Sequence, residues 1–354
     1  MEFFSEYGLF VAKAVTIVVA ILVTVGFIVG LTRRQQRDGG RGELEITEVN
    51  ELYRAMGEAL KAVGQNPAAA KQAAKAEKQK QKQEAKEQKA AAKRGEDSNV
   101  RKKRVYVIDF EGDIRASAVD NMRQEISAVL QDATVEDEVV VRLESPGGMV
   151  HSYGLASSQL DRIRKKAIPL TICVDKVAAS GGYMMACVGN RILAAPFAVL
   201  GSIGVVAQIP NFHKILKKND VDYELLTAGE YKRTLTMLGE NTEKGRQKFV
   251  EDLEDTHALF KDFIAEHRPQ VDLAQVATGE VWLGTRALHI GLVDELQTSD
   301  EYLQSKVADA DVLEVKFVQK KKLAERLGLV AEQSADNLLL RWWGRLTSQA
   351  NWIR

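Results

Sequence analysis

Between residues 104 and 195 the sequence alternates between short apolar, β-branched runs and longer stretches in which apolar residues recur every three or four positions. The first pattern is typical of buried strands and the second of amphipathic helices. Apolar strands that alternate with helices indicate an α/β fold with a largely parallel sheet. The predicted strands cover residues 105–110, 138–143, 170–174 and 191–195, and the predicted helices cover 118–130 and 150–165, with a further helix after residue 180.

A separate hydrophobic stretch runs from Leu9 to Leu31 and contains a single charged residue, Lys13. This length is enough to cross the ~30 Å hydrocarbon core of a bilayer, so the stretch predicts one transmembrane helix. Four arginines follow it between residues 33 and 41. By the positive-inside rule they favour a cytoplasmic location for the rest of the chain.

The stretch between the predicted anchor and residue 104 has a character of its own. Residues 43–63 carry apolar side chains at helical spacing, which predicts an amphipathic helix that docks on the body of the protein or pairs with a second copy. Residues 71–104 hold 13 Lys and Arg against 5 Asp and Glu, a composition typical of a solvated linker that can approach anionic lipid. The run lacks aromatic residues for base stacking, so we do not expect a nucleic-acid partner.

Composition narrows the function only a little. The formal net charge is zero, and 45% of the residues are hydrophobic, enough for a sizeable core. The two cysteines, Cys173 and Cys187, both lie in apolar segments and are expected to be buried thiols rather than a disulfide. They are too few for a zinc site, and the sequence predicts neither a metal nor an organic cofactor.

Ser180 lies where an apolar strand stops and an apolar helix begins, followed by Gly181 and Gly182. The first amides of a helix have no intrahelical partner, and the helix dipole there favours developing negative charge. Nucleophilic serines are often presented on such a turn, although Ala178 replaces the first glycine of the usual G-x-S-x-G pattern. The alternative is an ordinary serine helix cap followed by packing glycines.

The general base that would activate Ser180 is less clear from the residues alone. None of the five histidines has a recognisable triad setting, yet a Ser-His-Asp triad remains open because its members need not be close in sequence. Lys232, which follows Gly229 and a predicted strand, is the other candidate. A lysine acts as a base near neutral pH only in a dry pocket, and otherwise Lys232 is a surface residue.

Five segments of the chain, taken in order, resemble the motifs of a known protein family. The motifs are Glu144-Ser145-Pro146-Gly147-Gly148, Ala179-Ser180-Gly181-Gly182-Tyr183, Leu200-Gly201-Ser202-Ile203-Gly204-Val205, Ala228-Gly229-Glu230-Tyr231-Lys232 and the segment 281–294. From residue 104 to about residue 298 the chain resembles the signal peptide peptidase A family of serine peptidases, which has a ClpP/crotonase-like α/β fold. The whole arrangement of anchor, basic linker and one catalytic domain is similar to the SohB-type group of that family, found in Gram-negative inner membranes.

The resemblance implies roles for individual residues. Ser180 corresponds to the nucleophile, Lys232 to the general base of a Ser-Lys dyad, and Ser202 to the residue that orients the lysine. The amides of Gly147 and Gly181 would form the oxyanion hole. Leu200, Ile203, Val205 and the neighbouring Val206 would line a groove for apolar peptides. Family members form rings or domes in which neighbouring subunits can share one site, so we expect a homo-oligomer that cleaves signal-peptide remnants or other membrane-associated peptides.

These patterns divide the chain into five parts: residues 1–8 as a tail, 9–31 as the anchor, 32–103 as the linker, 104–305 as the peptidase domain and 306–354 as a C-terminal part. The last part predicts a strand at 313–318 and a tail rich in Trp and Arg, which fits a membrane interface or a neighbouring subunit. The resemblance favours a catalytic domain outside the cytoplasm, whereas the four arginines favour the cytoplasm, so the sequence leaves the side of the membrane open.

Two other functions remain open on the sequence. A crotonase-like enzyme would bind acyl-CoA and use glycine-rich turns to stabilise an enolate, without needing Ser180 or Lys232. A non-catalytic membrane scaffold would use the linker and the Trp-rich tail to recruit partners. The anchor argues against the first function, and the intact Ser180, Ser202 and Lys232 argue against the second.

Overall fold

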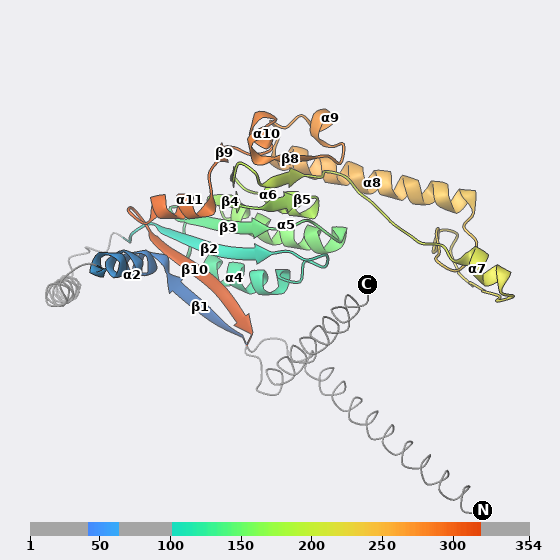
Figure 1. Ribbon diagram of the computed structural model, residues 1–354, viewed down its shortest axis with the longest axis horizontal. Helices are drawn as coiled ribbons and strands as arrows, with labels where there is room; N and C mark the ends of the chain where they lie inside the picture. The colour runs from blue at the N-terminus through green and yellow to red at the C-terminus, as the bar shows by residue number, and fades with distance from the viewer. Residues whose placement is uncertain (1–41, 64–100, 320–354) are drawn as a thin grey trace, which may run out of the picture. The chain divides into compact units, whose positions relative to one another are not determined.

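The computed structural model describes residues 42–63 and 101–319, and it has a mixed α/β fold (Figure 1). A seven-stranded sheet has the order β1-β10-β2-β3-β4-β6-β9, and from β10 to β9 all neighbouring strands are parallel. Its strands are β1 (Gly42–Glu48), β2 (Arg104–Glu111), β3 (Glu138–Glu144), β4 (Leu170–Val174), β6 (Arg191–Ala194), β9 (Glu295–Leu296) and β10 (Asp311–Gln319). The helices are α2 (Val49–Ala62), α4 (Val119–Asp132), α5 (Val150–Lys165), α6 (Gly181–Ala186), α7 (His213–Lys218), α8 (Glu243–His267), α9 (Leu273–Val276), α10 (Gly284–His289) and α11 (Ser299–Lys306).

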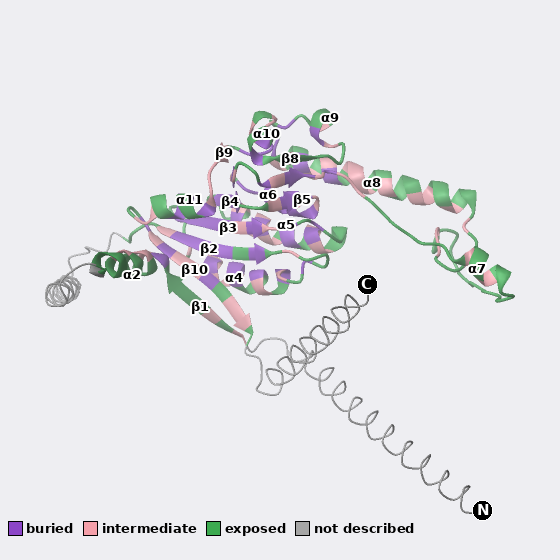
Figure 2. Ribbon diagram, in the orientation of Figure 1, coloured by how far each residue is buried: buried purple, intermediate pink, exposed green. Residues whose placement is uncertain are grey.

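Both faces of the large sheet are covered, as the alternation of strands and helices predicts. Along β2, Tyr106, Ile108 and Phe110 point into the main core with α4 and α5, whereas Val105 and Val107 point into a smaller core with α11. Successive side chains of a strand face opposite sides, so a strand that is apolar throughout must be buried on both. Figure 2 shows this burial along β2 and β3. The strands and helices predicted between residues 105 and 195 are confirmed.

A second, three-stranded sheet with the order β5-β7-β8 lies above the first and was not anticipated from the sequence. It consists of β5 (Val177–Ala179), β7 (Val199–Gly201) and β8 (Val281–Leu283). The strand that leads directly into Ser180 is therefore β5 and not the predicted strand at 170–174, which ends as β4 in the large sheet. Three-residue strands carry too few positions to show a periodicity, so only their pairing reveals them.

The ends of the described chain also join the large sheet. The strand predicted at 313–318 is confirmed as β10, which pairs with β2. The helix predicted over residues 43–63 begins only at Val49, because residues 42–48 form β1 next to β10. The side-chain amide of Asn50 fixes the start of α2, because its Nδ2 donates to the backbone carbonyls of Val307 and Ala310, 3.1 and 2.9 Å away. The first turn of α2 thus docks on the body, as one of the two alternatives predicts.

Both cysteines are free and buried, as predicted. Burial raises the pKa of the Cys173 thiol to about 12 and also raises that of Cys187. The predicted anchor at 9–31, most of the linker and the tail beyond residue 319 lie outside the described residues. None of the described helices combines the length and the apolar character needed to cross a bilayer. The domain boundaries at 104 and 305 stay predictions.

One part of the chain leaves the body between β7 and α8. We call residues 205–242 the arm; they contain α7, and none of them is buried. In Figure 1 the arm lies at the end of α8 that is remote from α6, and in Figure 2 it is largely green. Only Phe260 and Ile264 of α8 are buried, and both belong to its second half. The arm therefore has no hydrophobic core of its own within this chain.

The main core contains one carboxyl group without a charged partner in contact. Glu125 of α4 is buried, and its Oε1 accepts a hydrogen bond from the Phe317 amide, 2.8 Å away, while its Oε2 has no hydrogen-bond partner among the described residues. Burial raises the pKa of this carboxyl from 4.5 to about 7, and the charge of Asp109 adds to the shift, whereas the Phe317 amide and Lys316 oppose it. The folded protein therefore holds this proton more tightly than the unfolded chain does.

We expect Glu125 to make the folded protein less stable as the pH rises. A folded-state pKa above the unfolded value adds stability that is complete below about pH 4.5 and is lost as the pH approaches about 7. The loss from this one group is on the order of 3 kcal/mol. Thermal unfolding at pH 5 and pH 8 should show a smaller decrease in Tm for Glu125→Gln than for the parent. The exposed Glu136→Gln is the matched control, and equal decreases in all three proteins would contradict the assignment.

Candidate functional site

Ser180 lies between β5 and α6 in a conformation that non-glycine residues rarely adopt. Its φ is 53° and its ψ is −119°, and its amide donates to the Gly201 carbonyl, 2.8 Å away. Strain of this kind persists only where the surrounding structure enforces it, and it is concentrated at functional sites. A sharp strand-to-helix turn with a half-buried serine is also the geometry that presents a nucleophile.

Ser202 is brought close to Ser180 by strand pairing. β5 and β7 are parallel with Ala179 opposite Gly201, so the two serines directly follow the ends of paired strands. Ser202 also has a positive φ, 51°, and its amide donates to the Glu280 carbonyl at 2.6 Å. Two strained serines at adjacent strand ends form the centre of the candidate site, as the sequence motifs suggest.

The glycine turn after β3 packs directly against Ser180. The Ala179 amide donates to the Ser145 carbonyl at 3.0 Å, which ties β5 to this turn. Gly147 has a φ of 89°, and a Cβ added there would lie 2.7 Å from the Ser180 Cβ and 2.8 Å from the Gly181 nitrogen. The structure therefore places the predicted Gly147 beside the serine and leaves no room for a side chain.

The amide that is free in this turn is not the one that the sequence suggests. The Gly147 amide donates to Ser145 Oγ at 3.1 Å, and the Met149 amide donates to the Ile114 carbonyl at 2.8 Å. The Gly148 amide lies between them and has no acceptor among the described residues. The Gly181 amide, at the start of α6, likewise has none within the described chain. Gly148 therefore replaces Gly147 as the candidate donor, a change visible only from the hydrogen bonds.

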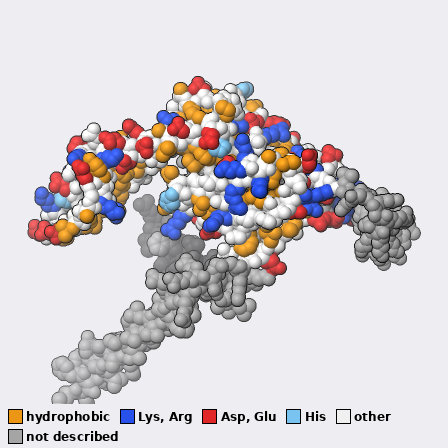
Figure 3. All heavy atoms as spheres, turned by 180° about the vertical axis from the view of Figure 1, so that it is seen from behind, with side chains coloured by type: hydrophobic (Ala, Val, Ile, Leu, Met, Phe, Trp, Pro, Cys, Tyr) orange, Lys and Arg blue, Asp and Glu red, His pale blue; other side chains and the backbone are white. Residues whose placement is uncertain are grey.

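Lys232 is not brought to Ser180 within this chain. It lies in the arm, its side chain is exposed, and its amide donates to the Gly229 carbonyl at 3.2 Å. The arm also carries exposed apolar residues, which Figure 3 shows between charged side chains. These include Phe212, Ile215, Leu226 and Met237, with Leu226 85% exposed. Within the described residues, the side chain of Lys232 and these apolar side chains are left exposed to solvent.

The predicted groove residues divide into two groups. Leu200 and Ile203 are completely buried in the main core, so neither lines an open groove. Val205 is half-buried and Val206 is 82% exposed, and both remain accessible. Leu200 and Ile203 are apolar because their side chains pack in the main core. The sequence alone does not distinguish this role from lining a groove. The backbone of residues 204–210 makes no hydrogen bond to other described residues.

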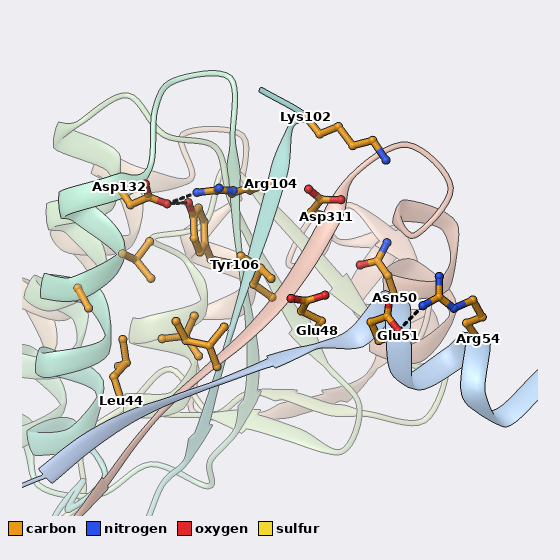
Figure 4. Close-up of a pocket in the computed structure, with 15 residues that line it drawn as sticks. Leu44, Glu48, Asn50, Glu51, Arg54, Lys102, Arg104, Tyr106, Asp132 and Asp311 are labelled. Carbon is orange, nitrogen blue, oxygen red and sulfur yellow. Dashed lines mark hydrogen bonds and ion pairs between the residues drawn. The ribbon is translucent and has the colours of Figure 1, made fainter. Parts of the chain in front are cut away.

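One described pocket lies elsewhere. It has a volume of about 660 Å³ and is lined by β1, α2, β2, α4 and β10, with charged and apolar side chains both spread along it (Figure 4). Arg104 forms an ion pair there with Asp132, and the Tyr106 hydroxyl donates to the same carboxylate at 2.6 Å. None of the predicted site residues lines it. Among the described residues, no three His, Cys, Asp or Glu side chains are placed to hold a metal.

Comparison with known proteins gives consistent matches along the chain. The model of the N-terminal part of peptidase family S49 matches residues 2–160, and the model of peptidase family S49 matches residues 162–313. The chain is 51% identical to the probable protease SohB of Haemophilus influenzae over 342 residues, 96% of each protein. It is 47% identical to the probable protease SohB of a Buchnera aphidicola strain over 307 residues, covering 86% of this chain and 100% of that protein.

We expect Gly147→Ala to disrupt the site while leaving the fold intact. The added methyl group would collide with the Ser180 Cβ and the Ala179 carbonyl, and the positive φ strains any side chain. Hydrolysis of an apolar fluorogenic peptide should fall at least ~100-fold, the scale of a misplaced catalytic group. Gly154→Ala is the matched control, because a methyl group there meets nothing within 4 Å. Circular dichroism should be unchanged in both, and parental activity in Gly147→Ala would refute the role of this turn.

Proposed function

The chain belongs to peptidase family S49, and we propose that it is a serine endopeptidase with a ClpP/crotonase-like fold and Ser180 as its nucleophile. One observation carries the proposal: the strained Ser180 lies beside a glycine turn and a helix start, each with an amide that has no acceptor among the described residues. Amides that are free before substrate binds can stabilise an oxyanion without reorganisation. Ser180 would then add to a peptide carbonyl whose oxygen is bound by Gly148 and Gly181.

The proposed reaction proceeds through an acyl-enzyme. Ser180 Oγ transfers its proton to the neutral amine of Lys232 and forms a bond to the carbonyl carbon. The tetrahedral intermediate collapses, the C–N bond breaks, and the leaving amine takes the proton from Lys232. Water then gives a proton to Lys232 and attacks the ester, and Ser180 regains its proton as the acid leaves. Ser202 would orient the lysine by a hydrogen bond.

We assign the general base to the Lys232 of a neighbouring copy. Within one chain Lys232 is exposed on the arm, whereas Ser180 and Ser202 directly follow β5 and β7 of the body. An arm without a core can be stabilised by burying its apolar residues against a second copy. Enclosing the amine at such an interface removes water from it, which favours the neutral form that accepts a proton. The functional unit would then be a homo-oligomeric ring or dome.

The segment beyond Ser202 suggests how an extended substrate binds. The backbone groups of residues 204–210 have no hydrogen-bond partner in the described part of the chain and can pair with a peptide as a strand, and Val205 and Val206 offer apolar contacts. Such a groove suits apolar, extended peptides. The predicted anchor at 9–31 would hold the enzyme at the bacterial inner membrane, and its substrates would be signal-peptide remnants or other membrane-associated peptides. The basic linker would contact anionic lipid.

Mixing inactive variants tests the shared site. Ser180→Ala and Lys232→Ala should each abolish peptide hydrolysis by the detergent-solubilised full chain. When the two are co-expressed with separate tags and purified together, activity should return to about a quarter of the parental value, because a site is intact only where a Lys232→Ala chain supplies the serine and a Ser180→Ala chain supplies the lysine.

Lys217→Ala, another basic residue of the arm, is the control and should remain active. If the co-purified pair stays as inactive as either variant alone, the dyad is not shared between copies. If Lys232→Ala alone keeps full activity while Ser180→Ala is inactive, the base is a different residue. If Ser180→Ala cleaves as the parent does, the assignment of Ser180 as the nucleophile, and with it the proposed serine mechanism, is refuted.

A further inference from the structure

Tyr153 contacts both halves of the candidate oxyanion hole from beneath. This residue of α5 is completely buried, and α5 begins directly after the glycine turn. A Cβ added at Gly181 would lie 2.4 Å from the Tyr153 Cγ, so the ring lies flush against the start of α6. Its hydroxyl lies 2.6 Å from Ser145 Oγ, at the start of the glycine turn. One side chain therefore touches both segments that carry the free amides.

The hydrogen bonds around Tyr153 have only one consistent direction. The Tyr153 hydroxyl lies 2.8 Å from the Asp113 carbonyl, which can only accept, so the single phenolic hydrogen is donated there. The Ser145 hydroxyl must then donate to Tyr153 Oη. A lone pair of Ser145 Oγ remains to accept the Gly147 amide at 3.1 Å. The chain runs from Gly147 through Ser145 and Tyr153 to Asp113, and each hydroxyl in it both donates and accepts.

This chain has a direct consequence for the free amide. By holding the Gly147 amide inward, Ser145 determines the orientation of the turn, in which the next amide, that of Gly148, is left without an acceptor in the described chain. The Met149 amide is held on the other side by the Ile114 carbonyl. A buried network in which every member is satisfied makes such a turn rigid. Burial also raises the pKa of the Tyr153 phenol, which keeps it protonated as a donor.

The close packing around the pair leaves no room for another arrangement. A Cβ added at Gly112 would lie 2.4 Å from Ser145 Oγ and 2.5 Å from the Tyr153 hydroxyl. A Cβ added at Gly182 would lie 2.5 Å from the Ser145 carbonyl oxygen. Neither Ser145 nor Tyr153 is accessible to a substrate, because both have zero exposure. Any effect of the pair on catalysis must therefore pass through the segments that it contacts, which include the glycine turn and the start of α6.

We propose that Tyr153 and Ser145 are positioning residues, which hold the amides of Gly148 and Gly181 at the spacing that binds the oxyanion. This inference rests on the proposed peptidase function. The hydroxyl of Tyr153 holds the glycine turn in place, and its ring holds Gly181, the first residue of α6, in place. Groups of this kind act most strongly on the transition state, where charge develops on the carbonyl oxygen.

Tyr153→Phe separates the two contributions, because it keeps the ring against Gly181 and removes only the hydroxyl. We expect kcat for an apolar peptide to fall about 10- to 100-fold with KM unchanged within about twofold, a loss on the scale of a weakened oxyanion-hole donor. A peptide aldehyde, which forms a tetrahedral adduct with the serine, should bind more weakly by a similar factor, whereas the matching peptide acid should bind equally well. Ser145→Ala should behave alike, and the double variant should be no worse than the single ones, because both act through one hydrogen-bond chain.

Tyr302→Phe is the matched control, since that tyrosine is also buried and its hydroxyl is bonded to Glu138 in the smaller core. It should lower Tm without changing kcat. If Tyr153→Phe lowers Tm to the same extent and leaves both kcat and aldehyde affinity unchanged, the pair is only structural and the proposal is refuted.

Hydrogen exchange provides a readout that does not depend on activity. In the parent, the Gly147 amide should exchange slowly and the Gly148 amide quickly, and Tyr153→Phe and Ser145→Ala should speed exchange at Gly147. Unchanged exchange in both variants would also overturn the inference. If instead Ser180→Ala proves as active as the parent, the proposed Ser180 mechanism fails separately, and exchange still decides whether the pair positions the turn.

Discussion

The candidate site depends on the position of β5, a strand of only three residues held from both sides. On one side Ala179 donates to the Ser145 carbonyl, and on the other Ser180 donates to the Gly201 carbonyl. These two hydrogen bonds fix the backbone on either side of the Ala179–Ser180 peptide. Because α6 begins directly after Ser180, the chain turns from β5 into the helix at this residue, whose backbone has a strained, positive φ. The same bonds bring together the ends of three segments that are far apart in sequence. The strained backbone of Ser180 and the meeting of the three segments therefore have one cause, which is the pairing of β5 between the glycine turn and β7.

The body and the arm are stabilised in different ways. In the body, strands that are apolar on both faces are buried between helices, and this core gives the site its rigidity. The arm has no buried residue, yet it carries Lys232 and several large apolar side chains. A rigid body that carries the proposed nucleophile, and an arm that is not buried against any other described part of the chain, make oligomerisation part of the proposed chemistry. Activity would then depend on protein concentration as well as on the residues of the site.

The hydrogen bonds from Gly147 through Ser145 and Tyr153 to Asp113 show what a sequence motif does and does not reveal about a site. The sequence Glu144-Ser145-Pro146-Gly147-Gly148 signals a tight turn, and the glycines are required because the turn lies against Ser180. Which glycine presents a free amide depends on where the hydroxyl of Ser145 points. That direction depends on Tyr153, which lies on the following helix. The assignment of Gly148 as an oxyanion donor is thus a tertiary property, because the direction of the hydrogen bonds depends on Tyr153 and on the Asp113 carbonyl that accepts from it.

By itself the sequence determined the strands β2, β3, β4 and β6 and the helices α4, α5 and α6, the final strand at 313–318, the buried thiols and the position of Ser180 at a strand-to-helix turn. These features follow from local periodicity and from turn chemistry, which neighbouring residues already display. Only the tertiary structure decided that residues 42–48 form a strand, that β5 and β7 form a separate sheet, and that Leu200 and Ile203 belong to the core. It also decided that the Gly147 amide is occupied and that Lys232 lies apart from Ser180. Each of these depends on pairing or packing between distant segments, and such contacts leave no periodic trace in the residues that make them.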